Sequence, residues 1–164
     1  LTSSEKTNLT SWWGLDSAVG EGLTHVADEH NESLGSELIV NANLSAGGAG
    51  APTFNDDKSV IIFSADSNAD SYVTHSSIIP EGKVYKFSYT VDSYTSGGLS
   101  VWETTYGSAS ARALDLTVGD HFIYMNGRDN SQLLLDDLGG GDDDIFTLSN
   151  LSVKEVLGNY GVLI

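Results

Sequence analysis

Cysteine is absent from this chain of 164 residues, and only 2 prolines and 1 methionine are present. Without cysteine there is no disulfide, no thiolate metal site and no cysteine nucleophile. The 4 histidines form no HExxH pattern, and GxSxG, P-loop and GxGxxG motifs are also missing. Because no acid, base, nucleophile or metal set converges in the sequence, we expect a protein that is not an enzyme and requires no cofactor.

Basic residues are scarce, since 7 Lys and Arg face 23 Asp and Glu and the formal net charge is −16. A surface of this sign repels phosphate backbones and anionic lipid headgroups. Apolar runs fall far short of the ~20 residues that a membrane helix needs. We therefore expect neither nucleic acid nor a membrane as a partner.

Glycine is plentiful at 18 residues, and short apolar runs recur from residue 37 onward. The run 83–92 alternates most clearly, because Tyr85, Phe87, Tyr89 and Val91 fall on one face. Further runs lie at 37–43, 59–64, 71–76, 99–105, 111–117, 120–126, 132–136 and 145–156. These patterns predict an all-β fold, an antiparallel β-sandwich or jelly roll of about 8–10 strands.

Three ranges divide the chain. Residues 1–36 show no clean period and are expected to form an irregular N-terminal arm. The sandwich is expected over 37–157, and 158–164 would form a C-terminal tail.

Two local signals refine the strands. In the last run the alternation changes phase near Ser149 and Asn150, which predicts a β-bulge. The tetrapeptide Asn126-Gly-Arg-Asp129 predicts a hairpin turn.

Aromatic rings near strand ends are candidate binding residues, because a ring can stack on the apolar face of a sugar. Trp102 is the preferred one, since Leu99 and Val101 share one strand face and Trp102 falls on the other. Packing in the core or at its rim is the alternative for each ring taken singly. The other candidates of this kind are Tyr72, Tyr94 and Tyr106.

Trp12 and Trp13 are adjacent in the expected arm. Neighbouring side chains on an extended segment point to opposite sides, so one ring could anchor on its own sandwich and the other on a neighbour. Burial of both within one molecule is the alternative.

Acidic residues beside a glycine run are candidate calcium ligands, because hard oxygen ligands on a flexible loop suit Ca²⁺. A solvated acidic turn is the alternative, and the spacing matches no EF-hand. The candidate ligands of this possible structural Ca²⁺ are Asp136, Asp137, Asp142, Asp143 and Asp144.

The ending Phe146-Thr-Leu-Ser-Asn-Leu-Ser-Val-Lys-Glu-Val156 resembles the closing strand of galactose-binding-like jelly rolls, a fold of many carbohydrate-binding modules. Lys83-Val-Tyr-Lys-Phe-Ser-Tyr-Thr-Val-Asp-Ser-Tyr94 and Leu9-Thr-Ser-Trp-Trp-Gly-Leu-Asp16 resemble segments of module-like domains in marine bacteriophage virion proteins. The resemblance implies a jelly-roll domain on the surface of a phage particle.

Two functions follow as expectations. The first is a capsid decoration, cement or fibre protein that assembles as a homo-oligomer, with a trimer favoured, on a major capsid or fibre protein of the virion. The arm with Trp12 and Trp13 would form the contact. The alternative is a secreted carbohydrate-binding module, with or without a requirement for Ca²⁺, that targets a cell-surface or marine polysaccharide.

Overall fold

The computed structural model describes residues 33–65, 70–105, 108–137 and 143–157. Eleven strands and one short 3₁₀ helix, Asn41–Asn43, lie in these ranges. The strands are β1 (Leu34–Glu37), β2 (Ser45–Gly47), β3 (Thr53–Phe54), β4 (Val60–Ala65), β5 (Tyr72–His75), β6 (Val84–Ser96), β7 (Ser100–Thr105), β8 (Ser108–Ala113), β9 (Gly119–Asn126), β10 (Leu133–Asp136) and β11 (Asp144–Val156). Among the described residues, no helix is long and apolar enough to cross a bilayer.

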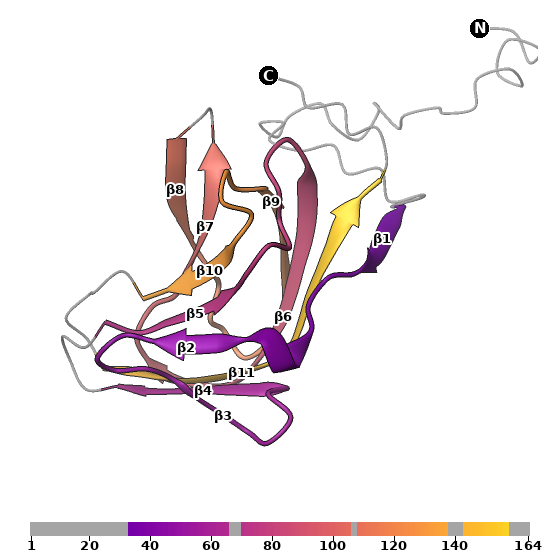
Figure 1. Ribbon diagram of the computed structural model, residues 1–164. Coiled ribbons are helices and arrows are strands. Elements are labelled where there is room, and N and C mark those ends of the chain that lie inside the picture. The colour runs from indigo at the N-terminus through magenta and orange to yellow at the C-terminus, as the bar shows by residue number, and fades with distance from the viewer. Residues whose placement is uncertain (1–32, 66–69, 106–107, 138–142, 158–164) are drawn as a thin grey trace, which may run out of the picture. The chain divides into compact units, whose positions relative to one another are not determined.

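The strands form two antiparallel sheets. The first, sheet A, has the order β3-β4-β11-β6-β9 with β1 added beside β11, and the second, sheet B, has the order β2-β5-β10-β7-β8. Figure 1 shows β11 running from beside β4 towards β1, so that this one strand contacts three partners. The expected all-β sandwich of the jelly-roll type is confirmed. Most of the expected arm and the whole expected tail lie outside the described residues, and the last residues of the arm range belong to β1.

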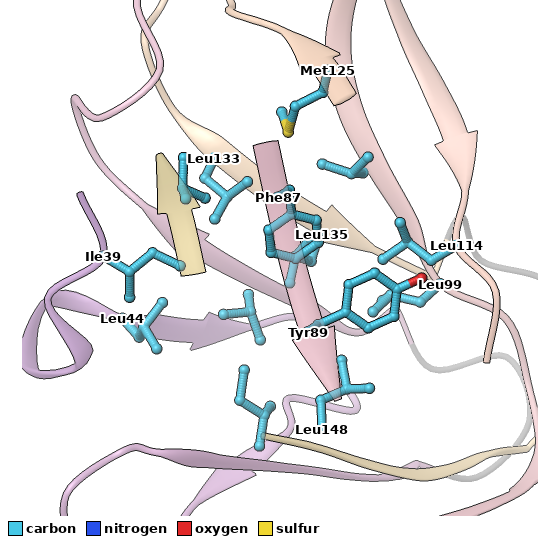
Figure 2. Close-up of a cluster of buried hydrophobic side chains, with 14 of the residues drawn as sticks. Ile39, Leu44, Phe87, Tyr89, Leu99, Leu114, Met125, Leu133, Leu135 and Leu148 are labelled. Carbon is cyan, nitrogen blue, oxygen red and sulfur yellow. The ribbon is translucent and has the colours of Figure 1, made fainter. Parts of the chain in front are cut away.

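The core lies between the sheets and follows the alternation of the sequence. Tyr85, Phe87, Tyr89 and Val91 on β6 are all at most 2% exposed, as the pattern of 83–92 predicts. Figure 2 shows Phe87 and Tyr89 in one cluster with Leu133 and Leu135 of β10, which belong to the other sheet. Burial of these apolar faces is the main stabilising contribution of the fold.

The predicted bulge in the last strand is confirmed. The pairing of β11 with β6 shifts between Ser149 and Ser152, and Asn150 has a φ of 52°. An extra residue in one strand reverses the phase of the side chains that follow. Leu148 before the bulge and Val153 after it therefore both point into the core.

Two predicted strand ranges are wrong. The range 37–43 ends as a strand at Glu37, whose Oε1 accepts the backbone N–H of Ile39 at 3.0 Å and of Val153 at 2.9 Å. The backbone pairing with β11 ends with Leu38 N–H, which donates to the Val153 carbonyl at 2.9 Å, and the chain then turns into the 3₁₀ helix. The range 111–117 is shifted, because β8 ends at Ala113 and the buried Leu114 and Leu116 belong to the connection that follows.

The hairpin predicted at 126–129 is also wrong. β9 pairs with β6, whereas β10 pairs with β5 and β7, so this segment carries the chain from one sheet to the other. A Cβ at Gly127 would lie 1.9 Å from the Pro80 carbonyl oxygen, so glycine is needed here for close backbone approach and not for a hairpin. The tight turn comes later, where Ser131 N–H donates to the Arg128 carbonyl at 2.9 Å.

A buried carboxylate links the two sheets near their β8 and β9 edges. Glu103 on β7 is 6% exposed, and its Oε2 accepts the backbone N–H of Asn126 at 2.9 Å. Its Oε1 lies 3.5 Å from Nε of Arg112 on β8, and Arg112 in turn donates to the carbonyl of Tyr124 on β9. This network adds polar contacts between sheet B and sheet A to the apolar packing of the core.

Candidate functional site

The outer face of sheet B carries aromatic and acidic side chains that the strand alternation turns away from the core. On β7 and β10, Val101 and Leu135 are fully buried, and their neighbours Trp102 and Asp136 lie on the opposite face. Asp136 pairs across the sheet with Tyr72 on one side and with Ser100 on the other. We call Tyr72, Trp102 and Asp136 the sheet B platform.

Trp102 is partly buried and held in place. Its Nε1–H donates to Oδ2 of Asp136 at 3.1 Å, and the Arg128 guanidinium carbon lies 6.0 Å from its ring centroid. The predicted orientation of Trp102, away from Leu99 and Val101, is confirmed. Its role in binding stays a prediction. A ring fixed by a hydrogen bond loses little side-chain entropy when a ligand stacks on it.

Tyr72 occupies the space that a missing side chain leaves on β2. Gly47 pairs with Tyr72, and a Cβ at Gly47 would lie 2.3 Å from the end of the tyrosine ring. The strand registers place Tyr72 two strands away from Trp102 and two residues along. With ordinary strand geometry, the two Cα atoms are about 12 Å apart, a span wider than one sugar ring.

A groove of about 380 Å³ adjoins the platform. Tyr94, Leu114, Leu116 and Asp137 line it, together with Ser100 and Ala113, which pair with each other in sheet B. Tyr94 is 45% exposed, and its hydroxyl donates to the Gly97 carbonyl at 3.1 Å. Ser100 pairs with Asp136 and Asp137 follows it in the chain, so the groove lies next to the platform residue Asp136.

Three carboxylates gather beside the groove. Asp70, Asp136 and Asp137 each offer an oxygen, and these oxygens lie within 4.8 Å of one another. The sequence predicted two members of this cluster and missed Asp70. Asp70 precedes β5 and Asp137 follows β10. The antiparallel pairing of β5 with β10 brings these two aspartates together, so a prediction of that pairing could have identified Asp70 as a member of the cluster.

Two further predicted calcium ligands, Asp143 and Asp144, lie elsewhere in the structure. Asp144 is buried, and its Oδ1 accepts the Gly98 backbone N–H at 3.2 Å, so this side chain stabilises the turn before β7. Asp143 is exposed, and its carbonyl accepts from Ser96 Oγ at 2.6 Å. Neither joins the described carboxylate cluster. The calcium site itself stays a prediction.

Four sequence candidates fall outside the described residues, namely Trp12, Trp13, Tyr106 and Asp142. One residue at the platform was not predicted at all. Arg128 was assigned to a turn, and its approach to Trp102 follows from the crossing of the chain between the sheets, which no local pattern encodes.

No family model matches the sequence, and no curated protein is similar to it. Solved structures that resemble the fold include family 29 carbohydrate-binding modules. One such module is 11% identical, with 76% of this chain and 89% of that chain covered and a TM-score of 0.48. A mutant module complexed with mannohexaose is 12% identical, with 76% and 92% covered and a TM-score of 0.48. A mutant complexed with cellulohexaose is 11% identical, with 73% and 89% covered and a TM-score of 0.48.

Proposed function

We propose that this chain is a non-catalytic carbohydrate-binding module whose ligand lies on the sheet B platform and in the adjoining groove. The observation that carries this proposal is the Trp102 ring, held by a hydrogen bond to Asp136 beside a groove whose lining includes Asp137 and Tyr94.

The chemistry of the platform suits a sugar chain. An aromatic ring stacks on the apolar face of a pyranose, and carboxylates accept hydrogen bonds from its hydroxyl groups. Tyr72 and Trp102 supply two rings across the face, and Asp136 lies between them in the register. Because the Cα atoms of Tyr72 and Trp102 are about 12 Å apart, we expect the ligand to be an oligosaccharide that spans both residues and not a single sugar.

The arrangement of carboxylates favours binding over hydrolysis. A glycosidase places two carboxyl groups on opposite sides of the scissile bond. Asp70, Asp136 and Asp137 instead form one cluster at one place on the face, and Asp136 is already a hydrogen-bond acceptor for Trp102. Incubation with a bound oligosaccharide should therefore release no shorter products.

Isothermal titration calorimetry of the full chain against linear hexasaccharides tests the proposal. Trp102→Ala should lower affinity at least tenfold, or about 1.4 kcal/mol, because it removes a rigid central aromatic contact. Phe122→Ala is the matched control, since Phe122 is 55% exposed but belongs to β9 in the other sheet. Equal losses in both variants, or the absence of binding to every hexasaccharide, would overturn the proposal.

Gly47→Ala gives a second test that substitutes none of the three platform residues. The added Cβ would collide with the end of the Tyr72 ring, which has to move. We expect weaker sugar binding with little change in thermal stability. Gly35→Ala is the control, because its Cβ would meet Glu155 at ordinary distances of 3.4 Å and more.

The virion role expected from the sequence stays a prediction, as do the homo-oligomer and the location on a particle. The contact that would carry this role depends on Trp12 and Trp13, which lie outside the described residues.

A further inference from the structure

Arg128 is a buried cation, and two of its three guanidinium nitrogens have no hydrogen-bond partner in the part of the chain that the structure describes. It lies between β9 and β10, where its backbone N–H donates to the Ile79 carbonyl at 2.8 Å. The residue is 9% exposed, and its Nε and Nη1 atoms are buried without a hydrogen-bond partner. Its contact with the ring of Trp102 at 6.0 Å places this cation beside the platform.

Such a group is costly to bury. Arginine keeps its charge at any ordinary pH, and each N–H that is withdrawn from water without an acceptor is destabilising. A cation–π contact with Trp102 offsets part of this cost but supplies no hydrogen-bond acceptor. Natural proteins rarely bury an unpaired charge, and buried charges are usually paired or bound to a ligand.

We propose that Arg128 pairs with a carboxylate of the ligand, so that the sugar chain bound at Trp102 contains uronic acid. This inference rests on the proposed function and narrows its ligand class. Nη2 is the guanidinium nitrogen outside the buried, unpartnered set, so we assign the contact to it: a charge-assisted hydrogen bond from Nη2 to the C6 carboxylate of a sugar that stacks on the Trp102 face away from the cation.

The charge of the rest of the molecule gives this binding a distinctive salt dependence. At a net charge of −16 the protein repels an anionic chain at long range, and added salt screens that repulsion. A largely buried ion pair is screened much less. Affinity for an acidic oligosaccharide should therefore hold or rise with NaCl, whereas binding through an exposed basic patch would weaken.

The test uses pairs of hexasaccharides that differ only at C6. We would compare hexamannuronate with mannohexaose, hexaglucuronate with cellohexaose, and hexagalacturonate with its neutral galactose counterpart, by calorimetry on the full chain. In at least one pair the acidic member should bind at least tenfold tighter. Arg128→Met should abolish this preference but retain the binding of the neutral member, and Arg128→Lys should keep part of the preference because it keeps the charge.

Lys154→Met is the matched control, since it removes the same charge from β11 of the other sheet and should leave the preference intact. Thermal melts establish that each variant is folded, and Arg128→Met should melt no lower than wild type because it removes an unpaired buried charge. Neutral members that bind as tightly as the acidic ones would overturn the inference but leave the proposed function standing. Failure of every hexasaccharide would overturn both, and a preference that survives Arg128→Met would overturn the role of Arg128.

Discussion

Tyr85 and Tyr89 make the stability of the sandwich sensitive to alkali. Burial raises the pKa of each phenol from 10 to about 12, and the Tyr89 hydroxyl donates to the Asp115 carbonyl at 3.0 Å. Because the folded-state pKa is raised, this stability is complete below pH 10 and is lost as the pH rises towards 12. Each tyrosine contributes up to about 3 kcal/mol to that loss.

Urea unfolding between pH 8 and pH 12 checks this expectation. Tyr89→Phe should flatten the decline of the unfolding free energy with pH, because one buried phenol no longer ionises. Tyr94→Phe should leave the decline unchanged, since Tyr94 is exposed. An identical decline in wild type and Tyr89→Phe would show that this phenol does not couple to folding.

Glu103 is a second residue whose substitution should strongly lower the free energy of unfolding. Glu103→Ala would leave the Asn126 N–H without its acceptor and remove the carboxylate that lies beside the Arg112 guanidinium, at a cost of about 3 kcal/mol. Glu103→Gln keeps an acceptor oxygen and should lose less. Chemical denaturation measures both values, and equal losses in the two variants would mean that the charge and not the hydrogen bond matters.

At the scale of elements, the bulge in β11 depends on one residue. Asn150 has a φ of 52°, a conformation that asparagine and glycine tolerate and β-branched residues do not. Asn150→Val should destabilise the domain by about 1–2 kcal/mol, and Asn150→Gly should be close to neutral. Thermal melts of the two variants check this, and a neutral Asn150→Val would indicate that the strand re-registers.

Among the elements of the fold, some can be predicted from local sequence patterns and others cannot. Alternation is local, so β6 and the bulge at Asn150 could be predicted from neighbouring residues alone. The hairpin at 126–129 could not be judged in this way, because Asn-Gly has the same local preferences whether the next strand joins the same sheet or the other one. Sheet membership is decided by packing between distant segments.

The candidate site was predictable to the same extent. The outward direction of Trp102 follows from strand phase, whereas its contacts with Asp136 and Arg128 join residues from three segments of the chain. Asp70 joins Asp136 and Asp137 only through the pairing of β5 with β10. Residue types at a site can therefore be anticipated strand by strand, and their combination requires the topology.

For the whole molecule, the excess of negative charge predicts a response to salt. Self-repulsion at a net charge of −16 destabilises the compact state, so NaCl should raise the melting temperature. Asp70→Asn should raise it in low salt and chelator, because it removes one of three clustered carboxylates.

The same melts test the expected calcium site. We compare the melting temperature in sodium chloride with that in calcium chloride at equal ionic strength. If the carboxylates bind Ca²⁺, the melting temperature is higher in calcium chloride, and if they do not, the two melting temperatures are equal. A melting temperature that falls with NaCl would contradict the view that net charge limits stability.

The place of β11 in sheet A has a consequence for how the chain is made. This strand lies between β4 and β6 and also pairs with β1, yet it is the last strand in the described sequence. Ribosomes release the N-terminal strands first, so β4 and β6 emerge without the neighbour that joins them. Sheet A therefore closes only after translation has passed Val156, and until then its strand edges are exposed to other nascent chains.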